Sequence, residues 1–125
     1  MACNSFTISE LFIALASNNV EQQVEFYTAL LQTEPNVTTP NYAEFRAYHL
    51  KIAIFKPNAD NVAEFESASS GAMSFCLEVD DLENVIARLT NLGYSLPGKI
   101  MKTSHGQEIY AYDPDGNRLI LHQSP

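Results

Sequence analysis

Three histidines and two cysteines are the first candidates for acid–base or covalent chemistry in this chain. The histidines are His49 at an expected turn, His105 in a polar loop and His122 near the end of the last expected strand, and all three are expected to face solvent. The cysteines, Cys3 and Cys76, form no CxxC pair, so neither a zinc or redox motif nor a disulfide framework is expected. Cys76 lies in an apolar strand pattern, which favours a buried, inert thiol over a nucleophile.

The charge balance narrows the class of ligand. The chain has 125 residues, with 7 Lys and Arg against 15 Asp and Glu, and a net charge of −8; this length supports one domain. An acidic protein repels nucleic acid and anionic membranes, so neither is expected as a partner, whereas a cationic or neutral ligand is permitted. Some acids, such as Glu21 and Glu83, fall at expected helix starts, where they complement the helix dipole.

The N-terminal sequence lacks the features of a targeting segment. It has no basic region, and its apolar run from Leu11 to Ala16 is too short for a signal sequence. No stretch reaches the roughly 20 apolar residues that span a bilayer. We therefore expect a soluble, cytoplasmic protein.

Alternating and helical apolar patterns place the elements that hold these side chains. In the first half, they predict a strand over 11–17, a helix starting near Val20 and ending before Pro35, and paired strands over 42–48 and 51–55. In the second half, they predict a strand over 73–79, a helix from Leu82 to Leu92 that Gly93 ends, a weaker strand within 96–102, and a hairpin of 107–112 and 117–122 around Asp113-Pro114-Asp115-Gly116. A linker over 58–71, with a helical turn at 62–65, separates the halves.

The two halves superpose at an offset of 62 residues, which aligns Leu15 with Leu77 and Val20 with Leu82. Asn18 or Asn19 is expected to cap the first helix, and Asp80 or Asp81 the second. A Glu follows the first member of each pair by three residues, which is the spacing of a capping box. The matching register predicts an internal duplication in which each half is strand–helix–three strands.

Four segments in this order resemble the vicinal oxygen chelate superfamily, which includes glyoxalase I, extradiol dioxygenases and bleomycin-resistance proteins. They are FIALASNNVEQQVEFYTALL (12–31), YAEFRAYHLKIAIFKP (42–57), FCLEVDDLENVIARL (75–89) and YAYDPDGNRLILHQ (110–123). The resemblance implies an α+β fold of two βαβββ modules whose curved mixed sheets form a cleft. The single domain, 1–125, would comprise module one over about 8–57, the linker, and module two over about 72–123. A homodimer is also implied.

Enzymes of this superfamily usually hold a divalent metal with four cleft-facing side chains, mainly His and Glu. Carried onto this sequence, the four positions fall at Phe12, Ala53, Ser74 and Ile120. None of these is a histidine or a carboxylate, and a neutral serine hydroxyl is a poor lone ligand. The resemblance therefore implies a member without the usual metal site, so no metal or other cofactor is expected, and metal-dependent glyoxalase or dioxygenase activity is disfavoured.

The same strand alternation predicts the other residues of the cleft. Small side chains would leave room, and Phe12 and Phe55 would supply aromatic walls. Glu78 and His122 share the parity of Ser74 and Ile120 and would form a polar pair. The facing of Arg46, Tyr48, Tyr110 and Tyr112 is not fixed by the pattern. The predicted ligand-binding residues are Phe12, Ala14, Ala53, Phe55, Ser74, Cys76, Glu78, Ile120 and His122.

Three functions remain open, and no catalytic residue is assigned. The favoured one is a metal-free small-molecule-binding protein of the glyoxalase/bleomycin-resistance type, with an apolar cleft and an unidentified ligand. The second is a lyase or isomerase that works without a metal, or with a metal at another site, through Glu78 and His122. The third is an interaction or regulatory module whose cleft is filled by its own side chains.

Overall fold

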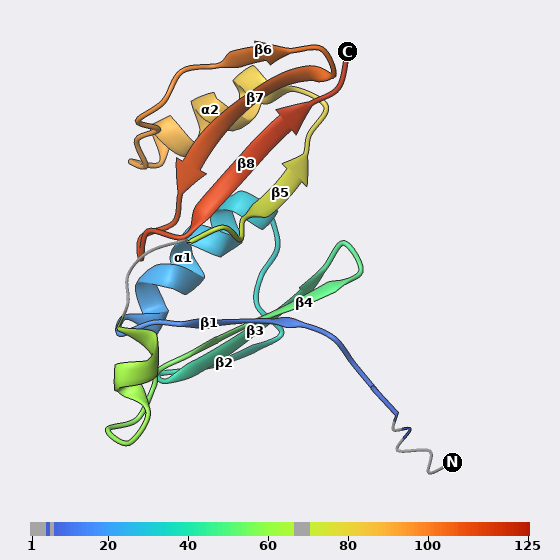
Figure 1. Cartoon of the computed structure of the whole chain (residues 1–125). Helices are drawn as coiled ribbons and strands as arrows, with labels where there is room; N and C mark the ends of the chain where they lie inside the picture. Colours follow the sequence, from blue (N-terminus) through green and yellow to red (C-terminus); the bar gives the residue numbers. More distant parts are fainter. Residues whose placement is uncertain (1–4, 6, 67–70) are drawn as a thin grey trace.

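Two four-stranded mixed sheets and two α-helices form the fold in a computed structural model, which describes residues 5, 7–66 and 71–125 (Figure 1). Sheet A has the strand order β1-β4-β3-β2 and sheet B the order β5-β8-β7-β6. This confirms the predicted α+β fold of two βαβββ modules. The strands are β1 (Ile13–Ala16), β2 (Val37–Thr39), β3 (Tyr42–Ala47), β4 (Leu50–Phe55), β5 (Phe75–Glu78), β6 (Met101–Thr103), β7 (Gly106–Tyr112) and β8 (Arg118–Gln123).

The two helices start 62 residues apart, as the duplication predicts. α1 spans Val20–Leu31 and α2 spans Leu82–Asn91. The second residue of each candidate pair is the cap: the Asn19 side chain accepts from the N–H of Gln22, and that of Asp81 accepts from the N–H of Asn84. The predicted capping boxes are therefore wrong, because Glu21 and Glu83 lie one position too early to reach back to the cap.

Edge strands are where the structure departs most from the sequence prediction. β2 was not assigned from sequence, and β6 begins at Met101, although a strand was expected within 96–102. Every residue of β2 and β6 is exposed. Such strands bury no face, so no apolar alternation marks them. The expected helical turn is confirmed as η1 (Val62–Phe65), whereas linker residues 67–70 lie outside the described residues.

α1 lies between the two sheets and packs on both (Figure 1). On sheet A it covers the face that carries Phe45 and Ile54, both fully buried. On sheet B its Tyr27 ring meets Phe75 edge to face, with ring centroids 6.0 Å apart. α2 covers the same face of sheet B through Leu82 and Leu89, so one core serves both modules. Neither α-helix of the described residues covers the opposite faces of the sheets.

Asp113 joins α1 to the turn between β7 and β8. This carboxylate, only 4% exposed, accepts from the Tyr27 hydroxyl at 2.7 Å and from the Gln23 amide nitrogen at 3.1 Å. The side-chain amide of Asn117 donates to the same oxygen at 2.8 Å. Burial raises the pKa of Tyr27 far above its usual value, and the nearby Asp113 charge raises it further. The turn that looks like a simple loop in the sequence therefore fixes one module against the other.

Neither helix has the length and apolarity that a membrane crossing would require, among the residues that the structure describes.

Candidate functional site

Seven of the nine predicted cleft residues lie in strands, on the sheet faces that the two α-helices leave uncovered, and Phe12 and Ser74 directly precede β1 and β5. On sheet A, Ala14 pairs with Ala53, and the neighbouring Ala16 with Phe55. On sheet B, Cys76 pairs with Ile120, and Glu78 with His122. Paired residues in neighbouring strands point to one face, and the alternate residues of the same strands form the core. The structure thus brings the predicted residues together in two groups, one on each sheet.

A polar and aromatic cluster surrounds the sheet A group. Lys51 is only 12% exposed in its side chain and places its ammonium 4.1 Å from the centre of the Phe12 ring, a cation–π distance. The same ammonium lies 3.4 Å from a Glu44 carboxylate oxygen and 3.5 Å from one of Glu10. Lys51 therefore holds Phe12, which is 42% exposed, at the edge of the uncovered face.

Hydrogen bonds fix the ionisation of this cluster. The Tyr42 hydroxyl donates to Glu44 at 2.7 Å; this bond lowers the pKa of Glu44 and raises that of Tyr42. Arg46 donates to Glu10 at 3.0 Å and lowers its pKa. The two cations and two carboxylates balance, so this face offers a ligand no net charge.

Phe55 and η1 close one end of the sheet A face. The rings of Phe55 and Phe65 meet edge to face, with centroids 5.2 Å apart. In the register of β1 and β4, the exposed Ala14 and the buried Ala53, which is 2% exposed, lie between Phe55 and Phe12. The result is a floor of small side chains between two aromatic rings, and aromatic or aliphatic ligand groups pack well on such a surface.

Glu78 and His122 form the predicted polar pair on sheet B. Nδ1 of His122 lies 2.6 Å from Glu78 Oε1, and Glu78 Oε2 accepts from both the backbone N–H and the hydroxyl of Ser124 at 2.8 Å. These bonds, that of His122 first, lower the pKa of Glu78. Such a carboxylate orients an imidazole so that its other nitrogen can accept a proton or a hydrogen bond.

The other ring nitrogen of His122 does not open to solvent, however. The side chain is only 16% exposed, so the expected solvent exposure is wrong, and Nε2 is buried without a hydrogen-bond partner. A Cβ at Gly106 would lie 3.1 Å from this nitrogen, so β7 covers it. His49 and His105 are exposed, as predicted.

The two cysteines, and the tyrosines and arginine whose facing the sequence pattern left open, differ in where the structure places them. Cys76 is exposed and free, because it lies on the uncovered face and not in the core; the expected burial is wrong. Cys3 lies outside the described residues. Tyr110 and Tyr112 pair with Ile120 and Arg118 and so share the uncovered face. Arg46 pairs with Lys51 on sheet A, whereas Tyr48 lies in the β3–β4 turn and donates its hydroxyl to Leu31 O at 3.1 Å.

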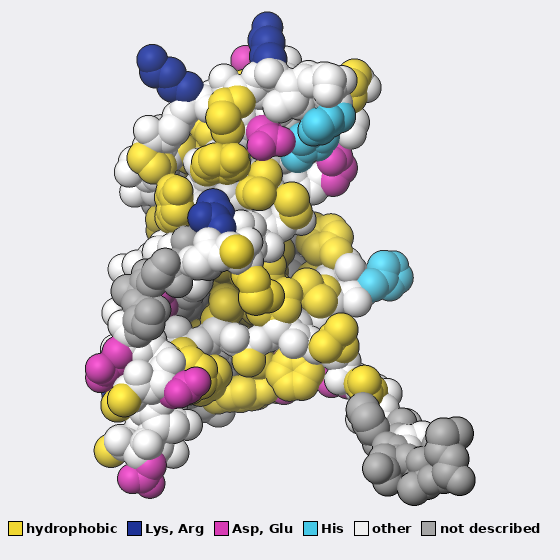
Figure 2. Space-filling model, in the orientation of Figure 1, with side chains coloured by type: hydrophobic (Ala, Val, Ile, Leu, Met, Phe, Trp, Pro, Cys, Tyr) yellow, Lys and Arg dark blue, Asp and Glu magenta, His cyan; other side chains and the backbone are white. Residues whose placement is uncertain are grey.

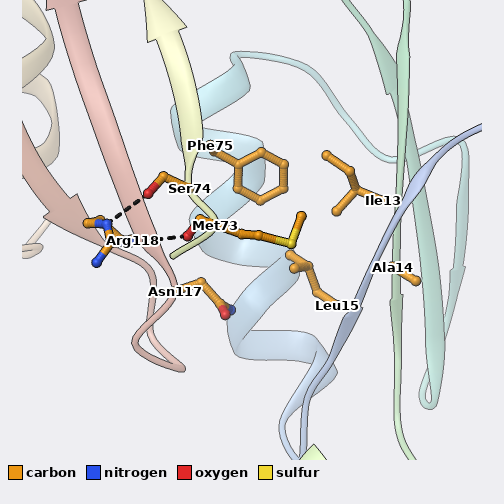
Figure 3. Close-up of a pocket in the computed structure, with 8 residues that line it drawn as sticks. All are labelled: Ile13, Ala14, Leu15, Met73, Ser74, Phe75, Asn117 and Arg118. Atoms are coloured by element: carbon orange, nitrogen blue, oxygen red, sulfur yellow. Dashed lines mark hydrogen bonds between the residues drawn. The ribbon is translucent and has the colours of Figure 1, made fainter. Parts of the chain in front are cut away.

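A cavity of about 260 Å³ lies where the edges of β1 and β5 approach each other (Figure 3). Ala14 of the sheet A group and Ser74 of the sheet B group both line it. Arg118 stands at its sheet B side and donates from Nε to the Ser74 hydroxyl at 2.7 Å. Figure 2 shows hydrophobic side chains gathered on the face in view, over both sheets and the hollow between them.

The four positions matched to metal ligands do not fit a divalent metal. Phe12, Ala53 and Ile120 have no donor atom, and the Ser74 hydroxyl already accepts from the Arg118 guanidinium. A metal cation at Ser74 would meet this positive charge at close range. Among the described residues, no group of three His, Cys, Asp or Glu side chains is arranged to hold a metal ion.

The fold consists of two βαβββ modules, and three of the four positions matched to metal ligands carry side chains without a donor atom. A family model described as "Glyoxalase/Bleomycin resistance protein/Dioxygenase superfamily" matches residues 11–121. The chain therefore belongs to the glyoxalase/bleomycin-resistance/dioxygenase superfamily. No curated protein sequence matches it significantly.

Solved structures share the fold along nearly the whole chain. A protein from Agrobacterium tumefaciens matches with a TM-score of 0.75 at 24% identity, covering 91% of this chain and 95% of its own. A glyoxalase-related enzyme from Fulvimarina pelagi gives 0.74 at 19%, covering 94% and 90%. The fosfomycin resistance protein FosX from Listeria monocytogenes gives 0.73 at 19%, covering 95% and 96%. These likenesses establish the fold.

Two functional candidates were missed from sequence although their signal was present. Lys51 is two residues before Ala53, and Arg118 two before Ile120, so strand alternation places both on the uncovered face. The roles of Glu10 and Tyr42 have no such signal, because they depend on contacts between separate strands and the N-terminal segment.

Proposed function

We propose that this protein binds a small, largely apolar molecule on its uncovered sheet faces without the help of a divalent metal. The observation that carries the proposal is the set of side chains at the four ligand positions, of which three cannot donate to a metal. The small floor at Ala14 and Ala53, between Phe12 and Phe55, supports an aromatic or aliphatic ligand.

A second copy of the chain is part of this proposal. Tyr110, Tyr112 and Met101 are all more than a third exposed on sheet B, and apolar side chains grouped in this way are typical of binding or interface surfaces. A homodimer would cover part of these faces and would enclose the ligand more fully than one chain does. Light scattering of the purified protein would give its mass.

Filling the floor of sheet A is the direct test of binding. Ala14→Phe places a ring on an exposed position, so folding should be preserved while the space for a ligand is lost. We expect the neutral fluorescent probe N-phenyl-1-naphthylamine to bind the wild-type protein and to bind Ala14→Phe at least about tenfold more weakly. Fluorescence titration measures both.

Ala87→Phe is the matched control, because Ala87 is exposed on the outer helix α2. It should bind the probe as the wild type does. The proposal fails if the wild-type protein does not bind the probe, or if Ala14→Phe and Ala87→Phe bind it equally. Metal analysis of protein purified without chelators should find less than about one metal ion in ten chains.

A second candidate function is acid–base catalysis by Glu78 and His122, favoured by their 2.6 Å contact. Because Nε2 of His122 is covered by β7, this role requires β7 to move from Gly106 onward. If a substrate is found, Glu78→Gln and His122→Ala should each lower kcat by about 100-fold or more. Unchanged turnover in both variants would eliminate this candidate, and Glu108→Gln on the neighbouring strand is the control.

A further inference from the structure

Arg118 differs from the other cations near the uncovered faces because it has no acidic partner. Arg46 and Lys51 are ion-paired with Glu10 or Glu44. No carboxylate of the described residues lies within 4.0 Å of Arg118, and neutral oxygens hold it instead. No acidic side chain of the described residues therefore balances its positive charge.

The neutral contacts also fix the direction of the guanidinium. Nε donates to the Ser74 hydroxyl at 2.7 Å, and Nη2 donates to the carbonyl oxygens of Gly71 at 2.6 Å and Met73 at 3.4 Å. A guanidinium has five N–H donors, and the two on Nη1 have no partner among the described residues. The Ser74 hydroxyl, while accepting from Nε, keeps its own hydrogen to donate. Two neighbouring groups thus present free donors.

These donors lie at the border of an apolar cavity. The cavity of about 260 Å³ is lined by Arg118, Ser74 and the apolar side chains of Ile13, Leu15, Met73 and Phe75. Figure 3 shows the Met73 and Phe75 side chains extending from the sheet B side toward Ile13 and Leu15 on β1, with Arg118 set to one side of them. A cavity of about 150 Å³ holds benzene, so this one holds a larger group such as two fused rings.

We propose that this cavity binds a small carboxylic acid with an aromatic or branched aliphatic body, and that Arg118 with Ser74 holds its carboxylate. The inference rests on the proposed small-molecule-binding function and assigns its ligand to the anionic class. A guanidinium binds a carboxylate through charge-assisted hydrogen bonds, and here the free N–H groups of Nη1 are the ones that can donate to it. The apolar body would lie between β1 and β5. The net charge of −8 permits a cationic or neutral ligand, whereas the proposed carboxylate would lie beside the local positive charge of Arg118.

Three naphthalene probes of one size and different charge test the proposal. They are 2-naphthoate, neutral 2-naphthamide and cationic 2-naphthylmethylamine, titrated calorimetrically at low salt. We expect 2-naphthoate to bind about tenfold more tightly than the amide, because charge-assisted hydrogen bonds exceed neutral ones by about that amount. The amine should bind most weakly, and added salt should weaken only the binding of the naphthoate.

Arg118→Gln should lower the affinity for 2-naphthoate to that for the amide and leave the amide unchanged, while Arg118→Lys should retain part of the preference. Arg88→Gln, which removes an exposed arginine of α2 that donates to Ala29 O and does not line the cavity, should change neither. Thermal unfolding of each variant, and the unchanged amide binding, would show that the fold is intact.

The outcomes separate this inference from the function on which it rests. If 2-naphthamide binds as tightly as 2-naphthoate, or if Arg118→Gln keeps the preference, the inference is overturned while small-molecule binding stands. If none of the three probes binds, and N-phenyl-1-naphthylamine does not bind either, both proposals are overturned together. Tighter binding of the amine than of the naphthoate would also overturn the inference, in favour of a cationic ligand.

Discussion

Replacing Asp113 with alanine is expected to lower the free energy of unfolding by about 3–5 kcal/mol. The carboxylate accepts hydrogen bonds from the Tyr27 hydroxyl, the Gln23 amide and the Asn117 amide, and the first two donors are buried. A buried donor that loses its acceptor costs about 1–3 kcal/mol. Two such donors would remain in Asp113→Ala, and the contact between α1 and the β7–β8 turn would be lost. Denaturant unfolding, followed by circular dichroism, measures the loss.

Asp115→Ala is the control for this prediction, because Asp115 occupies the same turn but is exposed. It should change stability by less than about 0.5 kcal/mol. Tyr27→Phe removes one of the two buried donors and should cost about 1–2 kcal/mol, an intermediate value. Equal midpoints for Asp113→Ala and Asp115→Ala would show that the buried carboxylate does not join the modules.

The role of Asp113 also marks a limit of prediction from sequence. The DPDG segment predicts a turn, and a turn is found. Its two buried partners are 86 and 90 residues away along the chain. Nothing in the local pattern shows that a turn residue is buried by a helix of the other module, because this depends on how α1 packs between the sheets.

The helices were predictable because their signals are local. The offset of 62 residues places both helix starts correctly at Val20 and Leu82, since an N-cap and the apolar spacing after it lie within one short segment. The capping boxes were misassigned because each start has two adjacent cap candidates. The second candidate caps in both halves, which is itself a sign of the shared origin of the halves.

The faces of the strands were predictable, but their arrangement in space was not. Alternation places Ala14, Cys76 and Ile120 away from the core, and the strand pairing agrees. The cavity that joins Ala14 to Ser74 depends on the distance between the β1 and β5 edges, which α1 sets from behind through Tyr27 and Phe75. A pattern of period two carries no information on that distance.

His122 is less exposed than expected because the start of β7 covers its side chain. Position 122 is near the end of a strand, which is why its side chain was expected to face solvent. Here β7 begins opposite it, and Gly106 and Gln123 bring the two backbones unusually close. A glycine is required at that point, and this leads to the second large effect.

Gly106→Ala is expected to lower the free energy of unfolding by about 2–4 kcal/mol. Gly106 has φ of +134°, a conformation that side chains disfavour, and an added Cβ would lie 2.1 Å from the carbonyl oxygen of Gln123. This oxygen belongs to the backbone of β8, so it cannot move without parting the strand pair at this end. Gly98→Ala, whose nearest neighbour would be 4.0 Å away, should be nearly neutral.

The double variant Gly106→Ala/His122→Ala separates the two contacts that the new methyl group would make. The His122 ring would lie 3.1 Å away and could turn aside, whereas the Gln123 carbonyl could not. Removing the ring should therefore fail to restore the stability lost in Gly106→Ala, beyond the cost of His122→Ala alone. Rescue by His122→Ala would place the clash on the imidazole and would mean that β7 and β8 can separate there, which is the movement that acid–base chemistry at Nε2 would need.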